Sequence, residues 1–317
     1  MNNATTLDPH ERVRSEVSKR YAQAVSQPAS GGCCGATADA GCGASSSKSL
    51  TVRTAGYDDA ELSALPADAV VNSFGCGNPL AFSGVREGDV VLDLGSGAGI
   101  DLLIAAKKVG PAGRVIGVDM TDAMIERARK NIAAAGASNV EVRKGIIEDL
   151  PVESGTVDWV ISNCVINLSP DKPKVFSEIA RVLKPGGRMS VSDIVAQDLP
   201  WWMRKSMKLY SACIGGAISE EAYVAGLRAA GLESVEVRER LVYEREHVEG
   251  FVRGILPSFM GGLAKPLQVA VAKLLVPLAG TVAGKIWSAK FYAVKPVAAE
   301  PARTPASETA AACCGGH

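Results

Sequence analysis

The sequence predicts an α/β fold, in which a parallel-type sheet carries helices on both faces and a smaller C-terminal α+β region follows. Three observations predict it. From Asp89 onward, short apolar runs alternate with helical patterns. A glycine-rich turn follows the first of these runs, and the alternation breaks down after Pro200. Apolar strands that alternate with helices are typical of a parallel sheet that is covered on both faces.

Five strands are expected in the alternating part, each a short apolar run, at 90–94, 115–118, from 140, 157–161 and 188–194. Helices are expected after the first, second and fourth of them, ending at about Lys108, Ala135 and Leu183. Thr121 is a suitable cap for the second of these helices. Beyond Pro200, Ser219 caps a further helix that stops at Gly231, and two more strands are expected at 235–242 and 289–294.

The ends of the chain fall outside this pattern. Pro9 opens an N-terminal helix in which an apolar residue recurs every fourth position from Val13 to Val25. Residues 29–47 read as a Gly/Ala/Ser-rich linker. We therefore predict four regions: an N-terminal helix and cysteine-containing linker (1–56), a nucleoside-binding domain (57–198), a C-terminal α+β region (199–296) and a disordered tail (297–317).

Composition excludes several partners. Lys plus Arg and Asp plus Glu number 34 each, so the formal net charge is zero and no basic surface for nucleic acid is expected. The polar start of the chain lacks the apolar stretch of a secretory signal. The longest apolar run, 269–284, is interrupted by Lys273 and Pro277, which favours a buried or amphipathic segment over a membrane span. We expect a cytoplasmic protein whose thiols stay reduced.

Cysteine usage is then informative. In a cytoplasmic chain of 317 residues, free, metal-binding or redox thiols are a better interpretation than a disulfide framework. The eight cysteines are Cys33, Cys34, Cys42, Cys76, Cys164, Cys213, Cys313 and Cys314.

A nucleoside site is predicted at the end of the first strand, where residues 93–99 read Asp-Leu-Gly-Ser-Gly-Ala-Gly. Glycines there let the backbone turn tightly and approach a ligand. The third glycine of a dinucleotide fingerprint is replaced by Ile100, so that fingerprint fails. Asp119 ends the second strand, where a carboxylate can accept hydrogen bonds from both ribose hydroxyls. Glu148-Asp149, after the third strand, offers carboxylates to an adenine amino group.

This set resembles the class I S-adenosylmethionine-dependent methyltransferases, roughly over residues 57–194. Leu-Lys-Pro-Gly-Gly at 183–187 is another family-like feature. The resemblance implies S-adenosylmethionine as the methyl donor. The donor site is expected to comprise Asp93, Gly95, Ser96, Gly97, Gly99, Asp119, Met120, Ile147, Glu148 and Asn163.

The sequence offers few bases for deprotonating an oxygen or nitrogen nucleophile. Only His10, His247 and His317 are present, none of them in the expected catalytic domain, although a carboxylate could serve. Three cysteines instead lie where the resemblance places the substrate: Cys76 precedes the first strand, Cys164 follows the fourth, and Cys213 lies early in the C-terminal region. Such thiolates suit a soft, thiophilic centre, and trivalent arsenic keeps a lone pair that needs no base. Taken singly, each cysteine also reads as a small buried apolar residue; zinc fits less well, because the spacing lacks CxxC and no histidine completes a set.

At these residues the chain is similar to the arsenite methyltransferase family, through residues 163–172 (Asn-Cys-Val-Ile-Asn-Leu-Ser-Pro-Asp-Lys) and 213–217 (Cys-Ile-Gly-Gly-Ala). The resemblance implies that Cys76, Cys164 and Cys213 bind arsenic, that arsenite and methylarsenite are substrates, and that a thiol reductant (glutathione or thioredoxin) is a co-substrate. Family members often carry a further redox cysteine, for which Cys33, Cys34 and Cys42 are candidates. The pairs Cys33-Cys34 and Cys313-Cys314 are either capture thiols or incidental ones.

Two alternatives remain open from the sequence. The first is a small-molecule C-methyltransferase of the quinone-methylating type, in which the cysteines are coincidental. The second is a non-catalytic arsenic-binding protein.

Overall fold

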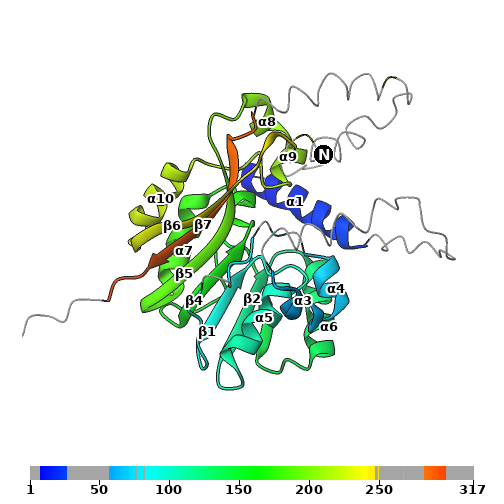
Figure 1. Ribbon diagram of the computed structural model, residues 1–317, viewed down its shortest axis with the longest axis vertical. Helices are drawn as coiled ribbons and strands as arrows, with labels where there is room; N and C mark the ends of the chain where they lie inside the picture. Colours follow the sequence, from blue (N-terminus) through cyan, green and yellow to red (C-terminus); the bar gives the residue numbers. More distant parts are fainter. Residues whose placement is uncertain are drawn as a thin grey trace, which may run out of the picture.

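The computed structural model describes residues 8–26, 57–73, 75, 77–80, 83–246, 249, 267 and 282–297. Figure 1 shows a twisted sheet with helices packed on both of its faces, and α1 lying between α9 and the α4–α6 side of the molecule. The linker at 29–47, the tail from 298 and most of the apolar run 269–284 lie outside the described residues. Within the described residues, no helix is long and apolar enough to span a membrane.

Seven strands form one sheet in the order β3-β2-β1-β4-β5-β7-β6. They are β1 Val90–Leu94, β2 Arg114–Asp119, β3 Val140–Lys144, β4 Val157–Asn163, β5 Leu183–Ala196, β6 Glu233–Val242 and β7 Ile286–Val294. The first five pair in parallel. β7 runs antiparallel to both β5 and β6, so the sheet is mixed. Strand order reverses between β1 and β4, and ligands of open α/β sheets bind at the carboxyl side of such a switch point.

The helices that cover the sheet are short to medium in length. They are α1 Pro9–Ser26, α3 Asp59–Ser63, α4 Ala67–Val71, α5 Ile100–Val109, α6 Asp122–Ala135, α7 Lys172–Val182, α8 Trp201–Lys205, α9 Met207–Tyr210 and α10 Glu220–Ala229, with a 3₁₀ turn at Ile166–Leu168. Ser219 caps α10 as expected, its hydroxyl accepting from the Ala222 N–H at 3.2 Å. Thr121 is the N-terminal flanking residue of α6, but its side chain makes no capping hydrogen bond.

Two apolar cores lie on opposite faces of the sheet. Val91 of β1 belongs to one core, whereas its neighbour Leu92 belongs to the other. Successive side chains of a strand point to opposite faces, which explains this alternation. On one face, Tyr223 of α10 stacks on Phe291 of β7 with ring centroids 4.0 Å apart. On the other, Trp159 packs with the residues of α5.

The observed strands differ from the expected ones in two respects: where β5 begins, and which sheet β6 and β7 join. β5 begins at Leu183 instead of 188, because Leu183 pairs with Val157 ahead of an irregularity in the β4–β5 ladder. β6 and β7 were expected in a separate α+β region, and they continue the main sheet from β5. Sequence periodicity locates these strands, but it does not say which strand a distant segment will pair with.

Candidate functional site

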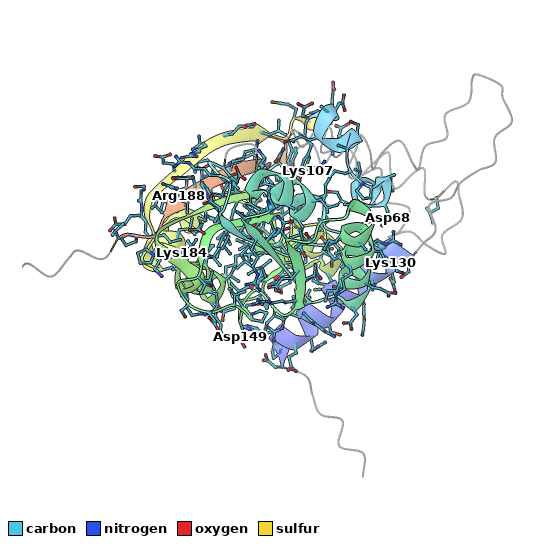
Figure 2. All side chains as sticks on the ribbon, turned by 90° about the horizontal axis from the view of Figure 1, so that it is seen from below. Asp68, Lys107, Lys130, Asp149, Lys184 and Arg188 are labelled. Carbon is cyan, nitrogen blue, oxygen red and sulfur yellow. The ribbon has the colours of Figure 1, made fainter. Side chains whose placement is uncertain are left out.

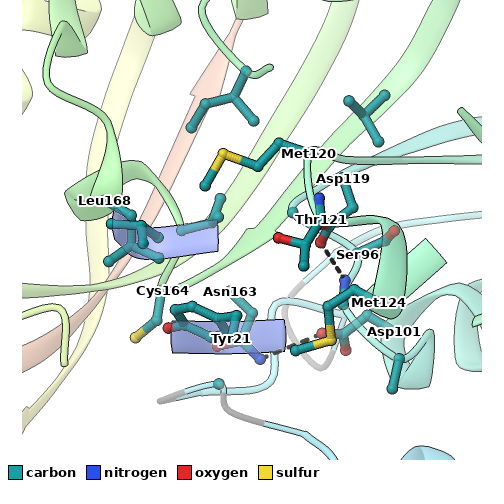
Figure 3. Close-up of a pocket in the computed structure, with 18 of the residues that line it drawn as sticks. Tyr21, Ser96, Asp101, Asp119, Met120, Thr121, Met124, Asn163, Cys164 and Leu168 are labelled. Atoms are coloured by element: carbon teal, nitrogen blue, oxygen red, sulfur yellow. Dashed lines mark hydrogen bonds between the residues drawn. The ribbon is translucent and has the colours of Figure 1, made fainter. Parts of the chain in front are cut away.

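A pocket opens at the carboxyl ends of β1, β2 and β4 (Figure 3). Of the residues predicted for the donor site, eight line it: Gly95, Ser96, Gly97, Asp119, Met120, Ile147, Glu148 and Asn163. Cys164 lines the same pocket. The predicted donor site and one predicted arsenic ligand are therefore adjacent.

The loop after β1 can approach a ligand closely only because of its glycines. Gly95 has φ of 67°, and a Cβ there would lie 2.2 Å from Cγ2 of Val165. A side chain at this position would be strained by the backbone and blocked by its neighbour. Glycine at this position therefore lets the loop pack directly against Val165, which itself lines the pocket.

Asp119 holds this loop against the end of β2. One carboxylate oxygen accepts from the Gly97 N–H at 3.0 Å and the other from the Thr121 N–H at 2.8 Å (Figure 3). Burial raises the pKa of Asp119, and these backbone hydrogen bonds oppose that rise. Each carboxylate oxygen has further acceptor capacity, so two ribose hydroxyls can still be bound.

Asp93 and Gly99, both predicted for the donor site, are not among the pocket-lining residues. Asp93 is 2% exposed, and burial, Asp101 and Asp119 together raise its pKa. Gly99 is the N-terminal flanking residue of α5, with φ of 93°. Asp93 lies within β1 and Gly99 directly precedes α5, so the two residues flank the glycine loop.

Glu148 is buried in the pocket wall. It accepts from the Ser169 hydroxyl at 2.7 Å and lies 3.7 Å from the guanidinium of Arg14. Asp149, the other carboxylate considered for the adenine group, is exposed at the edge of the molecule (Figure 2). Of the two carboxylates, Glu148 is the one that lines the pocket.

A hydrogen-bonded group beside the pocket was not predicted from the sequence. The Tyr57 hydroxyl donates to Asp101 at 2.8 Å and accepts from the Asn163 amide at 2.9 Å. Asn163 also bonds both the carbonyl and the N–H of Gly77, at 2.6 and 3.1 Å. These contacts join the loop around residue 77 to the end of β4, and only the tertiary structure brings them together.

Cys164 and Cys213 lie side by side in the described structure. The Cys213 thiol donates to the Cys164 carbonyl at 2.8 Å, and each residue is 4% exposed. Both have positive φ, 58° and 63°, a conformation shared among the described non-glycine residues only with Asp198 and Ser234. Such strain in non-glycine residues gathers at functional sites. Burial raises the pKa of Cys213 strongly.

Cys164 is disulfide-bonded, whereas Cys213 is free. These are the two cysteines within the described ranges. Cys76 lies outside the described residues, although its neighbour Gly75 lines the pocket and Gly77 bonds Asn163. Cys33, Cys34, Cys42, Cys313 and Cys314 also lie outside. No group of three potential metal ligands is present in the part of the chain that the structure describes.

Helix α1 contributes a wall of the pocket through Arg14, Val17 and Tyr21. The sequence predicted this helix and its apolar stripe, but assigned it no role in the site. The stripe itself was the available signal, since an apolar helix face needs a surface to cover.

Comparisons with known proteins agree with this geometry. A methyltransferase domain family matches residues 86–239. An arsenite methyltransferase of Halobacterium salinarum is 42% identical over 236 residues, covering 73% of this chain and 59% of that protein. One from Aquipseudomonas alcaligenes is 41% identical over 165 residues, covering 50% and 47%. The chain thus spans 59% of the length of the first of these curated relatives and 47% of the second.

A solved structure gives the same indication. The crystal structure of an arsenic(III) S-adenosylmethionine methyltransferase from Chlamydomonas reinhardtii is 32% identical, with a TM-score of 0.58. The match covers 79% of this chain and 75% of that one.

Proposed function

The chain belongs to the arsenite methyltransferase family, and we propose that it transfers methyl groups from S-adenosylmethionine to trivalent arsenic held by Cys76, Cys164 and Cys213. The observation that carries the proposal is the position of two buried cysteines beside the nucleoside pocket. Cys164 lines that pocket, and the thiol of Cys213 is hydrogen-bonded to the Cys164 backbone.

The pocket residues fit the methyl donor. S-adenosylmethionine, when bound, supplies an electrophilic methyl group on a sulfonium. Asp119 is placed to accept from its ribose, and Glu148 to accept from its adenine amino group. The turn at Gly95, which packs against Val165, forms part of the pocket wall beside them.

The cysteines hold the nucleophile. Trivalent arsenic bound by three thiolates keeps a lone pair, which is itself the nucleophile, so no general base is needed. Methyl transfer oxidises the arsenic from the trivalent to the pentavalent state. A reductant must then return two electrons before the next transfer.

Reduction is also needed at the protein. Because Cys164 is disulfide-bonded here, two electrons and two protons must reach that bond before the Cys164 sulfur can bind arsenic. This supports our proposal that glutathione or thioredoxin is a co-substrate. We further propose that the protein acts in the cytoplasm, where such reductants keep thiols reduced.

The test is product speciation for each cysteine-to-serine variant on arsenite and on methylarsenite. Serine offers a hard hydroxyl that does not ionise near neutral pH and is a poor arsenic ligand. We expect Cys164→Ser and Cys213→Ser to lose activity on both substrates. A methylated arsenic has one valence fewer for sulfur, so Cys76→Ser should lose activity on arsenite and keep it on methylarsenite.

Each alternative predicts a different result. A quinone-type C-methyltransferase would keep its activity in all three variants and would not methylate arsenite. A non-catalytic arsenic-binding protein would bind arsenite and yield no methylated product. Equal losses on both substrates for Cys76→Ser would contradict its role as the ligand released after the first transfer.

A further inference from the structure

Helix α1 forms a wall of the donor pocket and is held by polar contacts at Arg14 and at Val25. Arg14 is 3.7 Å from Glu148, on the pocket wall. Near the other end, the Arg127 guanidinium donates to the Val25 carbonyl at 2.7 Å. Between these two contacts, Val17 and Tyr21 line the pocket.

Tyr21 reaches beyond the donor pocket to the arsenic-ligand cysteines. Figure 3 shows it beside Cys164 and Asn163. Its ring packs against the apolar cluster that contains Cys164 and Cys213. Its hydroxyl donates to the Ser211 carbonyl at 3.4 Å and is also within hydrogen-bonding reach of the Cys213 sulfur.

The Tyr21 hydroxyl is influenced by a residue of each site, Asp119 of the donor pocket and the cysteine Cys213. Burial, Cys213 and Asp119 all raise the pKa of Tyr21, so its hydroxyl stays protonated and acts as a donor. The same hydrogen bond opposes the rise that burial and Asp193 impose on the pKa of Cys213. The phenol hydroxyl therefore lies where it can orient the Cys213 sulfur, next to the pocket wall that Tyr21 also lines.

We propose that Tyr21 is a positioning residue that holds the sulfur of Cys213 for arsenic, and that α1 thereby couples occupation of the donor pocket to arsenic capture. The proposal rests on the proposed function and adds a residue and a regulation to it. The evidence is the contact of one side chain with both the donor pocket and the free cysteine.

Arsenic capture changes the hydrogen bonds of this sulfur in a defined way. In the structure the Cys213 thiol donates its proton to the Cys164 carbonyl at 2.8 Å. When an S–As bond replaces the S–H bond, that proton leaves with a hydroxide of arsenite as water. The donated hydrogen bond is lost, whereas the one received from the Tyr21 hydroxyl can persist and orient the sulfur.

Coupling is expected because α1 forms a wall of the pocket that the donor would occupy. A ligand that holds α1 in place also holds Tyr21 at Cys213, and any such linkage is reciprocal between the two ligands. Donor-site occupation should therefore strengthen arsenite binding, and arsenite should strengthen donor binding by the same factor.

The test compares Tyr21→Phe with the wild type in the full-length, reduced protein. Arsenite dissociation constants are measured with and without S-adenosylhomocysteine, which occupies the donor pocket without reacting. Phenylalanine keeps the packing and removes only the hydroxyl. We expect arsenite affinity to fall about threefold to tenfold, as loss of one hydrogen bond implies, and the effect of S-adenosylhomocysteine on it to shrink.

A matched control is Tyr292→Phe on β7, whose ring packs on Trp159 and Arg238 away from the pocket. It should behave as the wild type in both measurements. Wild-type arsenite affinity and wild-type coupling in Tyr21→Phe would overturn the proposal.

A second readout needs no arsenic. The rate at which methyl methanethiosulfonate modifies Cys213 is compared at one fixed pH by peptide mass spectrometry in the wild type, Tyr21→Phe and Tyr292→Phe. Without the Tyr21 hydroxyl this rate should fall, because the hydrogen bond that orients the sulfur and favours its thiolate is lost, whereas Tyr292→Phe should react as the wild type does. An unchanged rate in Tyr21→Phe would refute the Tyr21–Cys213 contact, whereas failure of the wild type to bind arsenite would instead refute the proposed function.

Discussion

At the residue scale, Asp119 has two roles in the donor pocket. Its carboxylate oxygens accept from the backbone N–H groups of Gly97 and Thr121, and so hold the shape of the glycine loop. The same oxygens face the pocket, where they can accept from ribose hydroxyls. Donor recognition and loop structure therefore depend on one side chain.

We expect Asp119→Ala to weaken donor binding by about tenfold to a hundredfold, because hydrogen bonds to a charged group contribute about 1.5–3 kcal/mol each. Calorimetry with S-adenosylhomocysteine measures this loss. Asp122→Ala is the control, since the Asp122 side chain is 78% exposed and pairs with Lys144 on the surface. Unaltered affinity in Asp119→Ala would remove Asp119 from the donor site.

At the scale of elements, Arg127 of α6 links α1 to the body of the protein. Arg127 of α6 bonds both the Val25 carbonyl at 2.7 Å and the Asp68 carboxylate at 2.8 Å. A single side chain thus connects α1 with the segment that contains α4. Removal of Arg127 should loosen α1 without disturbing the sheet.

For Arg127→Ala we expect amide hydrogen exchange in α1 to rise about tenfold, as loss of roughly 1–2 kcal/mol of local stability implies. Donor affinity should fall as well, because α1 forms a wall of the pocket. Lys130→Ala on the same helix is the control, since its side chain is 74% exposed and pairs only with Glu126 in the described structure. If α1 exchange is the same in both variants, Arg127 does not hold the helix.

At the scale of the whole molecule, β5 joins the parallel and antiparallel parts of the sheet. Asp193 lies in the middle of β5, paired with Ala289 of β7 and completely buried. It accepts from the Asn167 amide at 2.8 Å and from the Ile194 N–H at 2.9 Å. Burial nevertheless raises the pKa of Asp193 from 3.8 to about 7.

This carboxyl should make global stability depend on pH. A pKa that is higher in the folded state favours the protonated, folded form, so its stabilisation is complete below pH 3.8 and is lost as pH rises through about 7. Between pH 5 and 8, we expect the wild type to lose about 2–3 kcal/mol more unfolding free energy than Asp193→Asn. Urea unfolding at both pH values tests this, and parallel losses in the two proteins would contradict it.

The sequence by itself determined much of this protein. Short apolar runs located the five parallel strands, and the helical patterns between them located the helices. Both signals are read over a few residues, because local backbone preference and apolar spacing act over short distances. The Asp-x-Gly-x-Gly-x-Gly turn and Asp119 identified a nucleoside site, since the ends of neighbouring parallel strands must meet at one edge. The motifs around Cys164 and Cys213 indicated the arsenite methyltransferase family before any geometry was known.

Only the tertiary structure decided which distant residues meet. Tyr21 and Cys213 are 213 − 21 = 192 positions apart along the chain, and no local pattern relates them. The same holds for Asn163 and Gly77, for Glu148 and Arg14, and for the pairing of β7 with β5. Such contacts arise because separate apolar surfaces are buried together, and burial is a property of the assembled chain. For that reason the sequence predicted the groups that carry the chemistry, whereas the fold decided which of them act on one another.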